Sequence, residues 1–347
     1  GTISLADGNM GHKLRTAGYT DCYTYTIPGK PHAVSSTAYT YGCSTNIYYY
    51  KYDANGNMAT RAFGSTTAYD RWVTWTAFSK PKQISVGAAS CGGDCATFNY
   101  GPDRQIVKQE VKTGGATRKI FYVGPHFEVE VGPGASEYRY RSNVLAGSET
   151  IYTQVEDSSG ASVDAYYPLR DHLGSVVAQY RAVGLGPQAI NYSYDAFGRR
   201  RNSNWTNDGS GSQMTATLWN HRGFTGHEML DNVQLIHMSG RVYDPTLGRF
   251  LSPDPLLDDL QMPQSLNPYS YVANNPLSYV DPTGYGLANF FKRLFSFKWV
   301  KNVVPEIITA AAYVGCASAT AATEGATAGV CTFALGSTGL TAYSIFR

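Results

Sequence analysis

The sequence predicts a mainly β protein whose antiparallel strands follow one another through tight turns. Tyrosine and glycine are frequent, with 27 and 36 copies among 347 residues, and they favour strands and turns respectively. A short unit, in which a strand runs into a turn, recurs along the chain. Segments of alternating apolar and polar residues lie between its copies, as in half-buried strands. No convincing amphipathic helix precedes residue 286, so hairpins should build most of the molecule.

The clearest copies of the unit are Tyr50–Asn57 (YKYDANGN) and Tyr192–Arg200 (YSYDAFGRR), and weaker copies occupy residues 98–104 and 166–174. Alternating tyrosines place their rings on one face of a strand. In the turn, the aspartate accepts local backbone hydrogen bonds and the glycine takes a positive φ. Asn55-Gly56 is the strongest hairpin signal in the chain. Each copy therefore predicts a strand together with the turn that ends it.

Further strands are predicted between these copies. Gln105–Val111 (QIVKQEV) and His126–Val131 (HFEVEV) alternate in the way that half-buried antiparallel strands do. A sheet assembled from so many hairpins must pair or cover its edges. We therefore expect a barrel-like or spiralling shell rather than a flat sheet.

The charge balance excludes two classes of protein. Charged residues make up 16% of the chain and hydrophobic residues 43%, which excludes disorder driven by charge. Lys and Arg number 28 against 26 Asp and Glu, so the net charge is +2. This leaves no basic excess to hold a phosphate backbone, and nucleic acid is not expected as a partner.

The six cysteines form three close pairs. An even number at local spacing suits disulfides in an oxidising compartment, although six buried free thiols remain an alternative because connectivity cannot be deduced from sequence. A zinc site is disfavoured, since no second Cys or His pair stands at a fitting distance from the CGGDC segment. The candidate disulfide pairs are Cys22 with Cys43, Cys91 with Cys95, and Cys316 with Cys331.

The chain changes character after Pro282. Residues 290–302 are aromatic and basic, and residues 325–346 carry no charge. The tail is therefore expected to be a separate, helical unit. Residues 307–346 contain uncharged stretches near the ~20-residue length that spans a bilayer, so membrane contact is one hypothesis. Their composition is rich in Ala, Gly and Thr and poor in Leu, which favours burial inside the shell instead.

Four motifs near the end of the β-rich part carry a family resemblance. The motifs read GFTGHE at 223–228, GRVYDPTLGRFLSPDP at 240–255, NPYSYVANNP at 267–276 and YVDPTG at 279–284. They appear in a fixed order and together resemble the Rhs-repeat-associated core. The upstream strand–turn units resemble the tyrosine–aspartate (YD) repeats of the same family.

The resemblance implies an architecture. YD-repeat strands would spiral into a shell or barrel around a hollow interior, and the Rhs core would close it. The implied domains are a YD-repeat β-shell segment at 1–218, the core at 219–285 and a variable, apolar C-terminal segment at 286–347.

The resemblance also implies a function. In related secreted toxins the C-terminal segment is the effector, held inside the shell until delivery. The chain is thus interpreted as an encapsulating shell fragment of a secreted Rhs-type toxin, with its own C-terminal segment as cargo. The alternative is a non-enzymatic structural or adhesion protein, secreted or at the cell surface. In that case its tyrosine-rich strand faces would bind carbohydrate or a cell-surface protein.

Many such cores cut their own chain, as an aspartic peptidase acting only in cis. The family's arginine falls on Arg241 and its Ser-x-Asp-Pro aspartate on Asp254. The second carboxylate usually follows the arginine directly, but this chain has Val242 there. Asp244, two residues further on, is therefore the candidate partner. Of two close carboxylates, the ionised one takes a proton from water and the protonated one donates, while the arginine holds one of them charged.

The cut is expected between Tyr285 and Gly286, although Tyr285 stands where the family motif usually has leucine. A purely structural role remains open for each residue. Asp244 and Asp254 both precede proline and would serve as turn residues, and Arg241 would serve as an ion-pair partner. No histidine is assigned to catalysis, and the sequence suggests no metal, nucleotide or other cofactor site.

Overall fold

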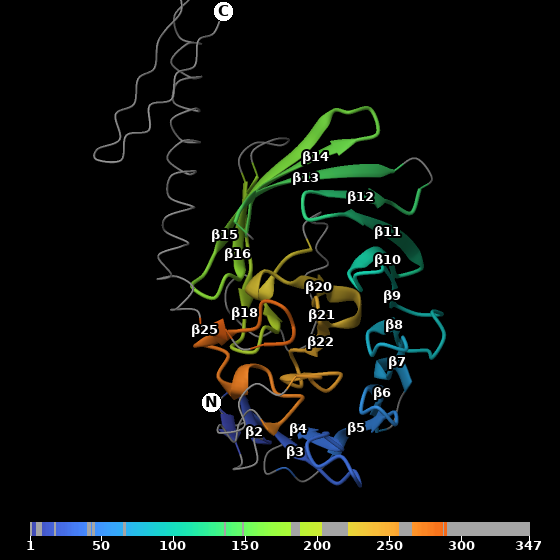
Figure 1. The fold of residues 1–347 in the computed structure, drawn as a ribbon, viewed down its shortest axis with the longest axis vertical. Helices are drawn as coiled ribbons and strands as arrows, with labels where there is room; N and C mark the ends of the chain where they lie inside the picture. Colours follow the sequence, from blue (N-terminus) through green and yellow to red (C-terminus); the bar gives the residue numbers. More distant parts are fainter. Residues whose placement is uncertain are drawn as a thin grey trace, which may run out of the picture. The chain divides into compact units, whose positions relative to one another are not determined.

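The computed structural model describes most of the chain up to residue 289 (Figure 1). Nearly all of these residues belong to one compact unit, which comprises 1–145 and 149–290. Ala146 and Gly147 belong to a second unit, which comprises 146–148 and 291–347. The expected helical tail, the membrane-contact hypothesis for residues 307–346 and the pair Cys316–Cys331 lie outside the described residues. Those described are 2–4, 9–16, 19–39, 43, 46–64, 67–134, 137–147, 149–181, 188–202, 221–256, 266–286 and 288–289.

A large antiparallel sheet of 17 strands dominates the fold. From β1 to β13, and again from β14 to β17, each strand pairs antiparallel with the next one in sequence. The strands are β1 (Thr2–Ser4), β2 (Met10–Thr16), β3 (Tyr19–Thr24), β4 (Ser36–Tyr39), β5 (Asn46–Tyr52), β6 (Met58–Phe63), β7 (Arg71–Trp75), β8 (Pro81–Val86), β9 (Cys95–Tyr100), β10 (Ile106–Thr113), β11 (Ala116–Val123), β12 (Phe127–Val131), β13 (Tyr138–Ala146), β14 (Glu149–Asp157), β15 (Ser162–Arg170), β16 (Val176–Arg181) and β17 (Gln188–Asn191).

Smaller sheets follow the large sheet along the chain. A four-stranded antiparallel sheet is flanked in sequence by two strand pairs, β18–β19 and β24–β25. The helical elements in the described ranges are three-residue 3₁₀ turns at Thr67–Tyr69, Phe224–Gly226, Asp231–Val233 and Val272–Asn274, and Cys43 and Leu266 are also in 3₁₀ conformation. The remaining strands are β18 (Ser193–Tyr194), β19 (Arg200–Arg201), β20 (Glu228–Leu230), β21 (Leu235–Met238), β22 (Arg241–Asp244), β23 (Arg249–Phe250), β24 (Tyr279–Val280) and β25 (Ala288–Asn289).

The prediction of a mainly β fold with few helices is thereby confirmed. Within the described residues, no helix is long and apolar enough to cross a membrane.

The repeated turn has the chemistry that the sequence predicts. In the copy at residues 50–57, the N–H of Asp53 donates to the carbonyl of Asn57, and the N–H of Asn57 donates to the Asp53 carboxylate at 2.8 Å. Gly56 takes φ +84°, a conformation that glycine adopts without a steric penalty. The same bonds and a positive-φ glycine recur in the turns Asp171–Ser175 and Asp195–Arg199.

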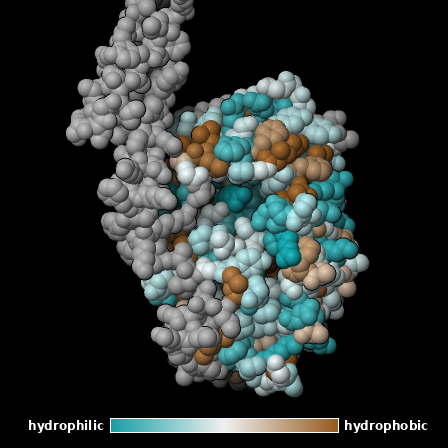
Figure 2. Space-filling view, in the orientation of Figure 1, coloured by the Kyte–Doolittle hydropathy of each residue, from teal (hydrophilic) through white to brown (hydrophobic). Residues whose placement is uncertain are grey.

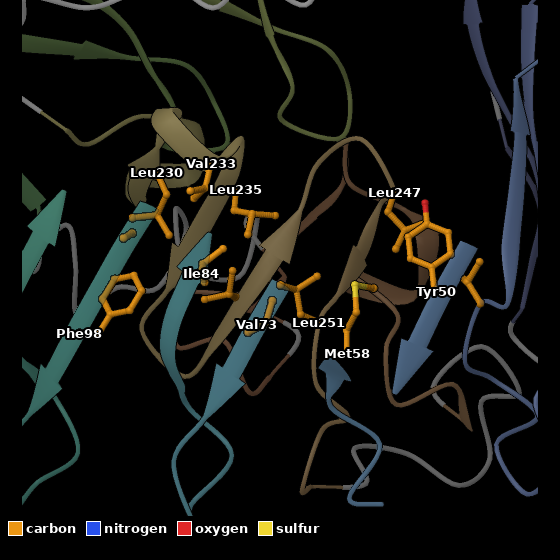
Figure 3. Packing of buried hydrophobic residues seen from close by; sticks show 13 residues of the cluster. Tyr50, Met58, Val73, Ile84, Phe98, Leu230, Val233, Leu235, Leu247 and Leu251 are labelled. Atoms are coloured by element: carbon orange, nitrogen blue, oxygen red, sulfur yellow. The ribbon is translucent and has the colours of Figure 1, made fainter. Parts of the chain in front are cut away.

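The strands of the large sheet and the four-stranded sheet share one hydrophobic core. In Figure 1 the strands from β5 to β10 curve past β20–β22. The side chains between them come from strands of both sheets and from the turns next to the four-stranded sheet, and they point toward one another (Figure 3). Burying them removes apolar surface from water, which stabilises the packing by about 25 cal/mol per Å². The labelled members of the cluster are Tyr50, Met58, Val73, Ile84, Phe98, Leu230, Val233, Leu235, Leu247 and Leu251.

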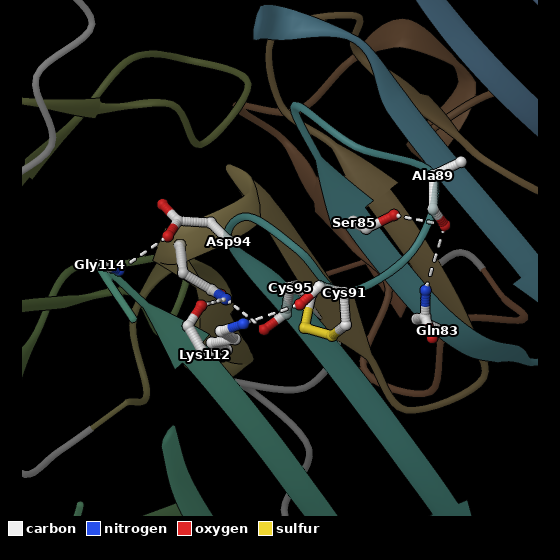
Figure 4. The surroundings of a disulfide bond; sticks show 9 residues. Gln83, Ser85, Ala89, Cys91, Asp94, Cys95, Lys112 and Gly114 are labelled. Atoms are coloured by element: carbon white, nitrogen blue, oxygen red, sulfur yellow. Dashed lines mark hydrogen bonds between the residues drawn. A yellow bond between two sulfur atoms is a disulfide. The ribbon is translucent and has the colours of Figure 1, made fainter. Parts of the chain in front are cut away.

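Two of the expected disulfides are present, Cys22–Cys43 and Cys91–Cys95. None of the cysteines in the described ranges is free. Cys91 and Cys95 close the connection between β8 and β9 (Figure 4). The Lys112 ammonium from β10 donates to the carbonyl of Cys91 at 2.9 Å and ties this loop to the next strand.

Candidate functional site

Arg241 lies at the start of β22 with its guanidinium between two carboxylates. Its Nη2 atom is 2.7 Å from Oδ2 of Asp254 and 3.4 Å from Oδ2 of Asp281. The guanidinium also donates to the carbonyls of Pro268 and Gly284 and stands over the Phe250 ring. Its side chain is only 4% exposed. We call Arg241, Asp254 and Asp281 the carboxylate–arginine group.

Burial lowers the pKa of Arg241, while the charges of Asp254 and Asp281 raise it. The guanidinium still stays charged at neutral pH, because an arginine pKa starts above 12. One buried cation therefore faces two carboxyl groups: its charge favours the ionised form of each, whereas two negative charges side by side disfavour one another.

Asp281 begins the turn that contains the expected cleavage point. Its Oδ1 atom accepts hydrogen bonds from the backbone N–H groups of Gly284, Tyr285 and Gly286, at 2.8, 3.1 and 3.0 Å. Burial raises the pKa of Asp281 above its ordinary value, although these N–H groups and Arg241 act in the opposite direction. A buried carboxyl group thus touches the amide nitrogen of the Tyr285–Gly286 bond.

Glycines hold this turn against the hairpin of β21 and β22. The N–H of Gly240 donates to the carbonyl of Thr283 at 2.8 Å. A Cβ atom on Gly240 would stand 2.6 Å from that same oxygen, and one on Gly284 would clash with the carbonyl of Met238. Gly284 also has φ +75°. The turn can reach Arg241 only because neither position carries a side chain.

A buried histidine fixes the other side of the turn. Nε2 of His227 lies 2.9 Å from the carbonyl oxygen of Asp281, and because a carbonyl can only accept, this nitrogen carries the proton. Burial lowers the pKa of His227 to about 4. His227 is therefore neutral at pH 7 and positions the turn without adding charge.

Asp254 combines an ion pair with a turn bond. Its Oδ1 atom accepts from the N–H of Leu256 at 2.9 Å, and its own N–H donates to Pro268 at 2.8 Å. The structure therefore contains both features considered for this residue, the partnership with Arg241 and the turn.

The structure does not bring Asp244 to this group. Its Oδ2 atom is 2.7 Å from the guanidinium of Arg71 in β7, and its Oδ1 atom accepts from the N–H groups of Thr246 and Leu247. Burial would raise its pKa, but Arg71 and its other partners hold the pKa of Asp244 below the ordinary value. The physical reason is the strand period of two, which puts Val242 and Asp244 on the face opposite to Arg241.

Asp281 is the residue that sequence reasoning missed. In the sequence it stands out only as the aspartate of the YVDPTG motif that precedes the expected cut. The available signal was a third Asp-Pro pair followed by glycine, since such an aspartate folds its carboxylate back onto the turn that follows. Its contact with Arg241, 40 positions earlier in the chain, gave no local signal.

A second charged cluster lies between β12–β13 and the segment before β20. Arg141 pairs with Glu128 at 3.0 Å and with Glu130, which also contacts His221 at 3.4 Å. These partners outweigh burial and lower the pKa of Glu130 to about 2. The cluster borders a polar cavity lined by Glu128, Arg141, Asn143, Thr150, Thr153, Arg170, His221, Arg222 and Glu228.

Comparison with known proteins identifies the architecture. A family model described as the teneurin YD-shell matches residues 103–277, about half of the chain. Salivary gland surface protein 1 of Aedes aegypti is 39% identical over 61 residues, which cover 18% of this chain and 2% of that protein.

Two bacterial relatives match over a longer stretch. The tRNA3(Ser)-specific nuclease WapA of Bacillus spizizenii is 25% identical over 236 residues, which cover 67% of this chain and 9% of the relative. The double-stranded DNA deaminase toxin A of Burkholderia cenocepacia is 26% identical over 254 residues, which cover 68% of this chain and 17% of the relative. The chain thus spans less than a fifth of the length of each of these relatives.

Solved structures share the fold. The crystal structure of TcdB2-TccC3-TEV aligns with a TM-score of 0.54 at 18% identity, covering 77% of this chain and 13% of that chain. A structure of the Photorhabdus luminescens Tc holotoxin pore gives the same TM-score and identity over 78% of this chain and 13% of that one.

Proposed function

The chain belongs to the teneurin YD-shell family, and from this membership we propose that it is the closing part of a secreted, Rhs-type toxin shell that encloses its own C-terminal segment, residues 286–347. The observation that carries the proposal is the carboxylate–arginine group. It anchors the last turn of the core, residues 281–286, directly before the variable segment. The names of WapA and of the deaminase toxin support a toxin role, because each of these relatives matches about two thirds of the chain.

Protection of the tail tests the enclosure. The segment contains Lys292, Arg293, Lys298 and Lys301, which trypsin can attack. An enclosed tail should resist trypsin at a protease concentration that cuts the urea-unfolded chain within minutes. Cleavage at these four residues at the same rate in folded and unfolded protein would contradict the enclosure.

We further propose that the chain hydrolyses its own Tyr285–Gly286 bond, with Asp254 and Asp281 as the two carboxylates. Asp254, held ionised by Arg241, takes a proton from water as the water oxygen bonds to the carbonyl carbon of Tyr285. In this step Asp281 reacts in its protonated form, which burial favours by raising its pKa. In the tetrahedral intermediate the nitrogen of Gly286, 3.0 Å from Oδ1, becomes pyramidal and takes this proton as the C–N bond breaks. Intramolecular presentation replaces the entropy cost of capturing a substrate.

Mass spectrometry at neutral pH tests the cleavage. Wild type should yield two fragments that meet at Tyr285 and Gly286, whereas Asp254→Asn and Asp281→Asn should stay intact. Asp195→Asn is the matched control, since it alters the same kind of turn far from the site in sequence. Wild type that remains one species, or equal cutting in all four proteins, would defeat the mechanism and leave the shell unaffected. The work-up must avoid acid, because Asp-Pro bonds are acid-labile.

One observation favours the adhesion function as a second candidate. Three rings on β12 and β13 form a nearly parallel row, with interplanar angles of 14° for Phe127 and Tyr140 and 13° for Tyr138 and Tyr140. The neighbouring Val123 is 62% exposed, and hydrophobic side chains gather at this end of the molecule in Figure 2. Aromatic faces of this kind suit the apolar face of a sugar. Calorimetric titration with a neutral oligosaccharide should show binding to wild type and none to Tyr140→Ala. The absence of a heat change with wild type would contradict this sugar-binding function.

A further inference from the structure

One histidine lies beside the first disulfide. His12 in β2 and Cys22 in β3 are directly paired across the two antiparallel strands, so both side chains lie on one face of the sheet. Cys43, which follows β4, completes the disulfide. A ligand nitrogen of His12 and the two sulfur atoms all lie within 4.8 Å of one another.

This set of atoms has the composition of a zinc site. Thiolate sulfur and imidazole nitrogen bind Zn²⁺ at about 2.3 and 2.0–2.1 Å, so ligand atoms around a tetrahedral ion stand roughly 3.3–3.8 Å apart. The His12 nitrogen lies within 4.8 Å of both sulfurs, whereas the two sulfurs are bonded to each other and have to move apart after reduction. Cys22 is buried and His12 half-buried, whereas Cys43 is exposed, and a rotation of this outer side chain would separate the two sulfurs enough to admit an ion.

We propose that the Cys22–Cys43 disulfide and a Zn²⁺ site are alternative states of the same three residues. When a thiol reductant supplies two electrons and is itself oxidised to a disulfide, the protein disulfide takes up two protons and becomes two thiols. Zn²⁺ then displaces both thiol protons and is bound by the two sulfurs and the His12 imidazole. Because Cys43 is exposed, water can reach the ion and occupy the fourth coordination position.

The alternative state has a structural consequence. In an oxidising compartment the covalent bond links β3 to the segment after β4. In a reducing compartment that link would be lost, but a bound ion joins the same two segments and adds β2 through His12. The N-terminal strands would thus keep a crosslink in both environments.

The second disulfide provides the internal control. Cys91 and Cys95 lie in a short loop, and among the described residues no histidine or carboxylate joins their sulfur atoms in a comparable group. Two ligands from one loop do not complete a zinc site. Reduction of this pair should therefore produce free thiols without a metal site.

Cobalt binding to the full chain tests the proposal. The variant carries Cys91→Ser, Cys95→Ser, Cys316→Ser and Cys331→Ser, so that Cys22 and Cys43 are its only cysteines. After anaerobic reduction with a phosphine, one Co²⁺ per chain should give the sulfur-to-cobalt charge-transfer and d–d absorption of a tetrahedral thiolate site, and Zn²⁺ should bleach it. The oxidised protein should give no such spectrum. The substitution His12→Ala should weaken Co²⁺ binding at least about tenfold, because even the loss of a residue that only hydrogen-bonds to a metal ligand lowers metal affinity by about that factor.

Two results would overturn the proposal. One is a reduced variant that is folded by circular dichroism but gives no thiolate–cobalt band. The other is a band that persists when Cys22→Ser is introduced. If the four-serine variant does not fold, reduced wild type and its Cys22→Ser form decide the question. Zn²⁺ should raise the unfolding temperature of wild type alone, and an equal effect on both proteins would refute the site.

Discussion

At the scale of single residues, distant partners decide what each carboxylate does. Arg241 and Asp254 could be paired from sequence because both belong to one motif with a characteristic order. The partner of Asp244 could not be predicted, since Arg71 lies 173 positions earlier in the chain. A buried carboxylate needs such a partner, because an unpaired charge in the interior costs several kcal/mol. The same long-range pairing explains why Asp281, and not Asp244, stands beside Arg241.

Buried histidines make stability depend on pH. Burial lowers the pKa of His227 to about 4, whereas in the unfolded chain it is about 6.5. Between these values the unfolded state binds a proton and the folded state does not, so stability is complete above about pH 6.5 and is lost as pH falls toward 4. His227→Gln should remove part of this loss, on the order of 1–3 kcal/mol between pH 7 and pH 4.

Urea unfolding at several pH values measures the effect. His126→Gln is the control, because His126 is exposed. If the free energy of unfolding falls by the same amount between pH 7 and pH 4 in His227→Gln and in wild type, protonation of His227 is not coupled to unfolding.

At the scale of elements, the strand–turn unit was the most predictable feature. The aspartate-to-glycine turn repeats with the same hydrogen bonds, because its geometry depends on residues four positions apart. The copy at 98–104 shows the limit of the pattern: its turn begins at Gly101, and Arg104, not a glycine, takes φ +61°. The close approach of the 281–284 turn to the β21–β22 hairpin is a tertiary contact, which local sequence does not reveal.

The glycine of the last turn should be far less replaceable than other turn glycines. Gly284→Ala introduces a Cβ both at φ +75° and against the carbonyl of Met238. Gly114→Ala meets only the conformational strain, because φ is +56° and no atom lies within 4 Å. We expect a loss of about 1–2 kcal/mol for Gly114→Ala and clearly more for Gly284→Ala. Chemical unfolding of the two variants compares them; equal losses would show that the turn can move away from the hairpin.

At the scale of the whole molecule, the two segments that the sequence separated at residue 218 are joined by shared contacts. Val73 and Ile84 of the large sheet lie in the same cluster as Leu230 and Leu235. Polar contacts cross the same boundary: Lys80 donates to Ser239, Asn232 to Cys95 and Lys13 to Pro245. The motifs predicted the order of these parts, but a cluster that draws on residues more than 200 positions apart has no signature in any one motif.

These shared contacts predict that residues 1–218 cannot fold without the core. Without residues 219–286, Val73, Ile84 and Phe98 would lose the apolar partners that bury them, and Arg71 would lose Asp244. Each large side chain left exposed would cost about 1.5–3 kcal/mol of hydrophobic stabilisation. The summed cost for a few such side chains approaches the total free energy of unfolding of an ordinary domain. A protein of residues 1–286 should therefore unfold cooperatively in urea with a defined near-ultraviolet circular dichroism signal, whereas residues 1–218 should show neither. If the shorter protein unfolds in a single sharp transition, whose denaturant dependence scales with its length, then the large sheet is an independent domain and the shared cluster is a docking surface.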